Sequence, residues 1–170
     1  MTRSLPVVKL RVPTEEDAVA WHGLFDDPEV MEFFGGKSAS PAAYERITAR
    51  QRGYAEQYGF CLWSVLDEDD QVVGFVGAQP WGQEWGPDRE TIEVAWRMGR
   101  AHWGRGYVTA AALRTLEVLR ESGLTSVIAM VDAENERSIA VTRRLGMELE
   151  ERLIAPDTQR DWNMYRLSLS

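Results

Sequence analysis

The sequence has 170 residues, of which 44% are hydrophobic and 27% are charged, and its formal net charge is −8. These proportions predict one globular domain spanning residues 1–170. The negative charge argues against nucleic-acid binding, which depends on neutralising phosphates, and no stretch approaches the ~20 apolar residues that cross a bilayer. The single cysteine excludes an internal disulfide, and the two histidines have no metal-ligand spacing, so we expect no metal.

The start of the chain has only a brief apolar segment, and Pro6 interrupts it. We therefore expect no secretory signal and a cytoplasmic protein. Residues 7–12 predict an opening strand. Thr14 is expected to cap a helix, with Asp17 at the capping-box position. Ser40, followed by proline, predicts a second helix over residues 41–58.

Three strands are predicted in the middle of the chain. Residues 60–66 and 71–79 flank an acidic turn and predict a hairpin. Residues 80–90 are expected to form a loop, and residues 91–98 alternate as a third strand. Cys61 could suggest an acyl-enzyme route, but its parity with apolar neighbours favours a buried, inert thiol.

The second half predicts alternating elements. A helix is expected from Tyr107 to about Ser122, and an apolar strand over 125–131 should be buried on both faces. A further helix over 135–146 and two antiparallel strands, 147–154 and 162–169, complete the order. The pattern predicts an α+β fold with a mixed sheet, whose parallel part lies in the middle of the chain.

The triplet Gly104-Arg105-Gly106 stands immediately before the long helix. Glycines at a helix N-terminus let a phosphate approach the main-chain N–H groups, and Arg105 adds a positive charge. A plain strand–helix turn is the alternative. The triplet is not a dinucleotide fingerprint, because Thr109 occupies the third glycine position, and the chain has no Walker loop.

Four segments together resemble the GNAT acetyltransferase superfamily. Residues 10–35, 92–112, 135–147 and 161–169 are similar to its motifs, in the family's order. The first is LRVPTEEDAVAWHGLFDDPEVMEFFG and the second is IEVAWRMGRAHWGRGYVTAAA. NERSIAVTRRLGM and DWNMYRLSL complete the match, which is specifically to the branch that acetylates N-termini of ribosomal proteins.

The resemblance implies a twisted mixed sheet flanked by helices, whose central parallel strands splay apart around acetyl-coenzyme A. The pantetheine arm would pair with the backbone of Trp96, Arg97 and Met98, and Asn135 would contact it. Asn135 is also a good helix N-cap. The pyrophosphate would rest on the main chain of Gly104, Arg105, Gly106, Tyr107, Val108 and Thr109.

Glu93 is the candidate general base for the acceptor amine, acting through water. Its alternative is an exposed carboxylate on the solvent face of the sheet, since parity places it with Ala95 and Arg97. Ser138 matches the position proposed for the acid that protonates the thiolate, and a solvated first-turn serine is its alternative. Thr142 replaces the tyrosine that serves as this acid in many relatives.

These features predict transfer of acetyl from acetyl-coenzyme A to a primary amine, on a protein N-terminus or a small molecule, by direct attack in a ternary complex. A non-catalytic acyl-coenzyme A sensor and an unrelated phosphate-binding scaffold are the alternatives. Trp81, Trp85 and the Phe33-Phe34 pair could wall an acceptor pocket or a contact in a possible homodimer. Packing under the sheet edge is the alternative for these aromatic residues.

Overall fold

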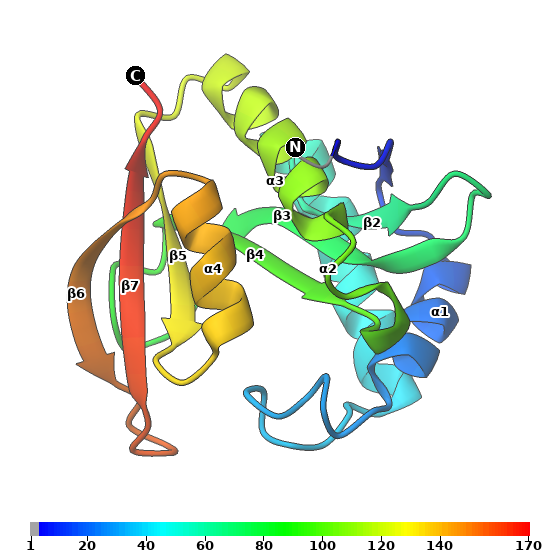
Figure 1. The fold of residues 1–170 in the computed structure, drawn as a ribbon, viewed down its shortest axis with the longest axis horizontal. Coiled ribbons are helices and arrows are strands. Elements are labelled where there is room, and N and C mark those ends of the chain that lie inside the picture. The colour runs from blue at the N-terminus through cyan, green and yellow to red at the C-terminus, as the bar shows by residue number, and fades with distance from the viewer. Residues whose placement is uncertain (1–3) are drawn as a thin grey trace.

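The computed structural model describes residues 4–170, and Figure 1 shows a mixed sheet with helices on both faces. The strands are β1 (Lys9–Arg11), β2 (Leu62–Leu66), β3 (Val72–Pro80), β4 (Ile92–Met98), β5 (Ser126–Asp132), β6 (Glu148–Ile154) and β7 (Asp161–Ser168). The helices are α1 (Glu15–Phe25), α2 (Pro41–Tyr58), α3 (Tyr107–Glu121) and α4 (Glu136–Arg144), with a short 3-10 helix at Arg100–His102. The predicted order and fold class are confirmed.

Two local predictions are corrected. The opening strand was expected over residues 7–12, and it forms only over Lys9–Arg11. The 3-10 helix between β4 and the glycine loop was not predicted, because its three residues are too few to show a helical period. Residues 1–3, which belong to the predicted domain and to the predicted signal-free start, lie outside the described residues.

The strands run in the spatial order β1-β2-β3-β4-β5-β7-β6, and every neighbouring pair is antiparallel except β4 and β5. This central parallel pair shares one register position, Glu93 opposite Ile128, whereas β3 pairs with β4 along its whole length. The backbone of β4 beyond Glu93 therefore has no partner strand on the β5 side. The predicted splay of the central strands is confirmed.

The sheet is covered differently on its two faces. On one face α1 and α2 enclose a largely aromatic cluster that includes Trp21, Phe25, Tyr44 and Phe75. On the other face α3 and α4 pack on a larger, mainly aliphatic cluster formed by residues of the central strands and of the helices. Successive residues of β4 point alternately to the two faces, so this strand contributes side chains to both environments.

The helix starts follow the predicted caps. Thr14 accepts a hydrogen bond from the Asp17 amide, and the Asp17 carboxylate accepts one from Thr14, which completes the capping box. Ser40 caps α2 through the Ala43 amide. The first turn of α3 differs, because Gly106 at its N-cap position has no side chain to bond the free amides.

Candidate active site

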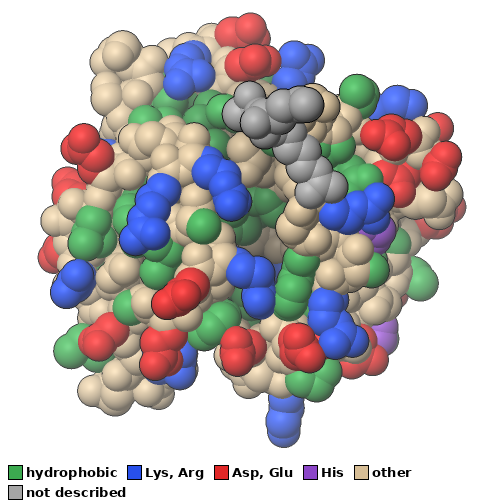
Figure 2. All heavy atoms as spheres, viewed as in Figure 1, with side chains coloured by type: hydrophobic (Ala, Val, Ile, Leu, Met, Phe, Trp, Pro, Cys, Tyr) green, Lys and Arg blue, Asp and Glu red, His purple; other side chains and the backbone are tan. Residues whose placement is uncertain are grey.

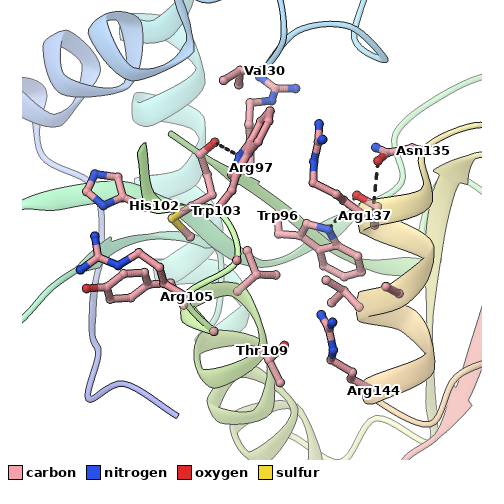
Figure 3. Close-up of a pocket in the computed structure, with 18 of the residues that line it drawn as sticks. Val30, Trp96, Arg97, His102, Trp103, Arg105, Thr109, Asn135, Arg137 and Arg144 are labelled. Atoms are coloured by element: carbon pink, nitrogen blue, oxygen red, sulfur yellow. Dashed lines mark hydrogen bonds between the residues drawn. The ribbon is translucent and has the colours of Figure 1, made fainter. Parts of the chain in front are cut away.

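A cavity of about 450 Å³ opens where β4 and β5 separate. It is bounded by β4, the glycine loop, the start of α3, α4 and the segment between α1 and α2 (Figure 3). Its lining includes Trp96, Arg97, Met98, Gly104, Arg105, Gly106, Tyr107, Val108, Thr109, Asn135 and Ser138. The structure thus brings together every predicted cofactor residue and Ser138, whereas Glu93 is not part of the lining.

The glycine loop presents main-chain amides to this cavity. Gly104 and Gly106 have φ angles of +70° and +85°, a left-handed conformation that glycine adopts without strain. A Cβ built at Gly104 would meet no atom within 4 Å, so the space beside Gly104 is open, whereas a Cβ at Gly106 would lie within 3.2 Å of Leu5 and Pro6. Because no side chain caps α3, its first N–H groups point toward this space with a partial positive charge.

Three arginines line the cavity, and two of them were missed by the sequence analysis. Arg137 and Arg144 project from α4, and Arg105 from the loop (Figure 3). The Arg137 guanidinium lies over the Trp103 ring at 3.6 Å from its centroid. Among the ion pairs of residues 4–170, none includes these three arginines.

This wall of the cavity suits a polyanion. Figure 2 shows basic side chains around a hollow in this face of the molecule. Open helix N-terminal amides together with unpaired guanidinium groups fit the phosphates of a coenzyme A molecule. The spacing of seven between Arg137 and Arg144, two turns along one helix face, is the signal that could have identified them.

Ser138 connects α4 to β4. Its hydroxyl accepts a hydrogen bond from the Trp96 indole N–H at 3.1 Å, and its amide donates to the Asn135 side chain at 3.3 Å. Ser138 is half-buried in the first turn of α4, so part of its side chain remains exposed to solvent. Asn135 is buried and caps α4, so the side chain has a capping role in addition to lining the cavity.

Glu93 lies on the opposite face of β4 from Trp96. Its exposed fraction is only 8%, so the expectation of an exposed carboxylate is wrong. The predicted parity with Ala95 and Arg97 is correct, but α1 and α2 cover that face. Gln79 donates a hydrogen bond to Glu93 at 3.0 Å. Burial raises the pKa of Glu93 to about 7, and the bond from Gln79 opposes part of this effect.

Of the remaining candidate residues, some pack inside the protein away from the cavity and others line it. Cys61 is fully buried, and burial raises the pKa of its thiol to about 12, which confirms an inert side chain. Trp81 donates to the Trp85 carbonyl, and Trp85 packs edge-on against Trp162, away from the cavity lining. Phe33 and Phe34 do line the cavity.

The family model described as an acetyltransferase (GNAT) domain matches residues 8–148. The chain belongs to the GNAT acetyltransferase family. It is 29% identical over 159 residues to the uncharacterized protein YkkB of Bacillus subtilis (strain 168), covering 92% of this chain and 87% of that protein. It is 28% identical over 148 residues to the mycothiol acetyltransferase of Rhodococcus jostii (strain RHA1), covering 82% of this chain and 48% of that protein.

Solved structures show the same fold. A GNAT-family acetyltransferase from Bacillus anthracis superposes with a TM-score of 0.79 at 20% identity, covering 98% of this chain and 97% of that one. The yncA protein of Salmonella typhimurium, described as a putative acetyltransferase with its cofactor acetyl-coenzyme A, has a TM-score of 0.74 at 17% identity, covering 96% and 94%. As a member of the GNAT family, this chain is an acetyltransferase that uses acetyl-coenzyme A.

The described residues contain neither a membrane-spanning helix nor a cluster of metal-binding side chains. No helix within residues 4–170 has the length and apolar character needed to cross a membrane. The same residues contain no cluster of three or more histidine, cysteine, aspartate or glutamate side chains arranged to hold a metal ion.

Proposed function

We propose that this acetyltransferase acetylates a primary amine by direct attack of the amine on the thioester in a ternary complex. The observation that carries the proposal is the continuous cavity from the glycine loop, past the unpaired edge of β4, to the α1–α2 segment. One end suits a polyanion, and the other has room for a second reactant. Holding two reactants together in this way supplies ~7–11 kcal/mol of the barrier.

The cofactor would be held at the glycine-loop end of the cavity. The main-chain amides of residues 104–109 would bind the pyrophosphate, with Arg105, Arg137 and Arg144 close to the phosphates. The backbone of residues 96–98 would pair with the pantetheine arm, and Asn135 would contact it. When bound, acetyl-coenzyme A supplies an acetyl group activated as a thioester.

Glu93 would take the proton from the acceptor amine. An alkyl amine is largely protonated at neutral pH, so a base with a pKa near 7 is well matched to the task. Since Glu93 does not line the cavity, a water molecule would carry the proton between the amine and the carboxylate. Gln79 holds the carboxylate in place, and Gln51 in turn donates to Gln79 at 2.8 Å.

The β4 backbone and Ser138 would stabilise the negative charges that develop on the acetyl oxygen and on the departing thiolate. An unpaired N–H group near residues 96–98 would stabilise the negative oxygen that develops on the acetyl carbonyl. The Ser138 hydroxyl accepts from Trp96, which leaves its own O–H able to donate to the departing thiolate. A thiolate with a pKa near ~8.5 needs only weak assistance of this kind.

The class of acceptor, the cellular location and the assembly of the enzyme are further parts of the proposal, and they rest on the sequence. The four quoted segments support membership of the branch that acetylates ribosomal protein N-termini, with a protein N-terminus or small-molecule amine as acceptor. A cytoplasmic enzyme, and a homodimer as its assembly, are the corresponding expectations.

Release of free coenzyme A thiol tests the proposed function. The purified chain is mixed with acetyl-coenzyme A and a panel of amines that includes N-terminal peptides, amino acids and polyamines, and acetylated products are identified by mass spectrometry. Amine-dependent thiol release supports the proposal. Stabilisation by acetyl-coenzyme A with no thiol release on any acceptor would instead indicate the sensor alternative, and no stabilisation would indicate an unrelated phosphate scaffold.

A further inference from the structure

The Arg97 side chain lies at the end of the cavity opposite the glycine loop. It points from β4 toward the α1–α2 segment near Val30, whereas Trp96 points toward α4 (Figure 3). Phe34 covers the guanidinium, with its ring centroid 4.2 Å from Cζ. Phe25 and Phe75 lie at 5.4 Å and 5.3 Å. Aromatic rings therefore surround a full positive charge in the wall of the cavity.

Within residues 4–170, this guanidinium has no anionic partner. Among the ion pairs of the described residues none includes Arg97, although the exposed Arg100 three positions later binds both Asp27 and Glu29. The Arg97 Nε atom is buried without a hydrogen-bond partner. Burial lowers the pKa of the guanidinium, and the Tyr44 hydroxyl offsets only part of this effect.

An unpaired charge in such surroundings is unfavourable for folding. The attraction to the three rings compensates only part of the lost hydration, and buried arginines are ordinarily paired with carboxylates. A neutral apolar residue would fill the same space at lower free energy. The charge is therefore explained by a ligand that brings the missing anion into the cavity.

We propose that Arg97 binds a carboxylate carried by the acceptor, so that the substrate class is small amino acids with a free carboxyl group. The inference rests on the proposed acetyl transfer to an amine. The planar guanidinium fork matches a carboxylate through two parallel hydrogen bonds, which sets the orientation of the substrate as well as its affinity. Phe33, Phe34 and Val30 would contact the apolar part of the molecule.

The geometry of β4 places this anchor on the acceptor side. Arg97 and Glu93 share one face of the strand, four residues and thus ~13 Å of backbone apart. Carboxylate binding at Arg97 would direct the amine along the strand toward the region served by Glu93. The phosphates of the cofactor would be bound by the loop amides and by Arg105, Arg137 and Arg144, which come from the glycine loop and α4 rather than from the α1–α2 side of β4.

The test compares the wild type with Arg97→Met, Arg97→Lys and the exposed control Arg114→Met. Each is assayed for thiol release with α-, β- and γ-amino acids and with the corresponding carboxamides. The wild type should prefer the free acid, and Arg97→Met should lower the acid-to-amide ratio of kcat/KM by roughly 10–100-fold. Arg97→Lys should recover part of this ratio, because it keeps the charge but loses the fork.

Thermal unfolding without ligand separates this role from a structural one. Removing an unpaired buried charge should raise the Tm of Arg97→Met, whereas loss of a structural contact would lower it. The shift in Tm produced by coenzyme A should be retained. A lost coenzyme A shift would make Arg97 a cofactor ligand and overturn the proposal, as would a lowered Tm accompanied by equal losses of kcat/KM on acids and amides.

Failure of the proposed function can be told apart from failure of this inference. Equal use of amino acids and their amides by the wild type would leave acetyl transfer standing and refute the carboxylate anchor. If no acceptor releases thiol, N-acetylglycine and its N-methylamide serve as binding probes. If N-acetylglycine stabilises the wild type, its N-methylamide does not, and Arg97→Met abolishes the stabilisation, the carboxylate anchor is still supported. No stabilisation of the wild type by N-acetylglycine would refute the anchor. Acidic peptides acetylated in preference to free amino acids would also contradict it.

Discussion

The two ends of the cavity are built in opposite ways. The proposed cofactor end is built around consecutive residues, 104–109, at the start of α3, and three exposed arginines stand beside them. The proposed acceptor end has Arg97 in the cavity wall beside aromatic residues from α1, α2 and the segment between them, and Glu93 lies on the same face of β4 but outside the cavity lining. Ionisable groups are solvated at the first end and buried at the second.

The difference indicates how each end obtains its properties. At the proposed cofactor end, affinity would derive from local backbone geometry and from charges that water already solvates, so single side chains should contribute modestly. At the acceptor end, burial alters the protonation of Glu93 and leaves Arg97 without a counter-charge. Substitutions at the first end should change binding, and substitutions at the second should change pH dependence and specificity.

The largest expected effect is at Gly104. Gly104→Glu places a negative charge where the pyrophosphate would lie and should raise the Kd for coenzyme A by roughly 100-fold or more. Gly123→Glu is the matched control, since Gly123 also has a positive φ and open space around a Cβ, at the other end of α3. Titration calorimetry measures both. Equal losses of affinity in the two variants would attribute the effect to backbone strain and contradict the phosphate site.

Glu93→Gln should lower kcat by about 100-fold while coenzyme A binding is retained, because general-base assistance is lost but the cofactor end is untouched. In the wild type, kcat/KM should rise with pH through about 7 as the carboxylate ionises. The variant should lack this limb. A stopped-flow or steady-state pH profile checks both statements, and an unchanged limb in the variant would exclude Glu93 as the base.

The same carboxylate should make folding stability depend on pH. The pKa of Glu93 is raised from 4.5 to about 7 in the folded protein. The contribution of the protonated carboxyl to the free energy of unfolding is therefore fully present below pH 4.5 and is lost as pH rises through 7. The wild type should lose about 3 kcal/mol of unfolding free energy over this range relative to Glu93→Gln. Urea denaturation at pH 4 and pH 8 measures the difference, and parallel curves would contradict it.

Ser138→Ala tests the role of the hydroxyl that bonds the Trp96 indole. If the hydroxyl assists the thiolate, turnover should fall ~10-fold and coenzyme A affinity should be retained. The substitution also removes the acceptor of the Trp96 indole N–H. Single-turnover rates with thioesters of leaving groups of different pKa distinguish the two roles: a rate loss that grows with leaving-group pKa supports the acid, and a uniform loss indicates positioning of Trp96.

The smallest effect is expected at Arg137. Arg137→Ala should weaken coenzyme A binding about 3–5-fold at low salt, because a solvated charge contributes little and is screened by ions. The difference from the wild type should shrink at 0.5 M salt. Arg114→Ala, an exposed arginine on α3, is the control. A salt-independent loss would mean that Arg137 acts mainly through its stacking on Trp103.

Predictions from the sequence succeeded where the determining interactions are local. The caps at Thr14 and Ser40, and the glycine loop before α3, involve residues a few positions apart, so short patterns identified them. The burial of Glu93 was missed because alternation assigns a residue to a face of a strand without showing what covers that face. Arg137 and Arg144 were missed because the caps of helix 135–146 predict its ends but do not show which of its faces borders the cavity.

The sequence by itself determined the order of elements, the family and the position of the glycine loop before α3, since each depends on neighbouring residues or on motifs in a fixed order. Only the tertiary structure decided that α1 and α2 bury the acidic and basic side chains of β4 and that Trp96 meets Ser138 across 42 positions. Burial and long-range contacts arise from the packing of distant segments. They set the pKa of Glu93 and leave Arg97 unpaired, and neither follows from a local pattern.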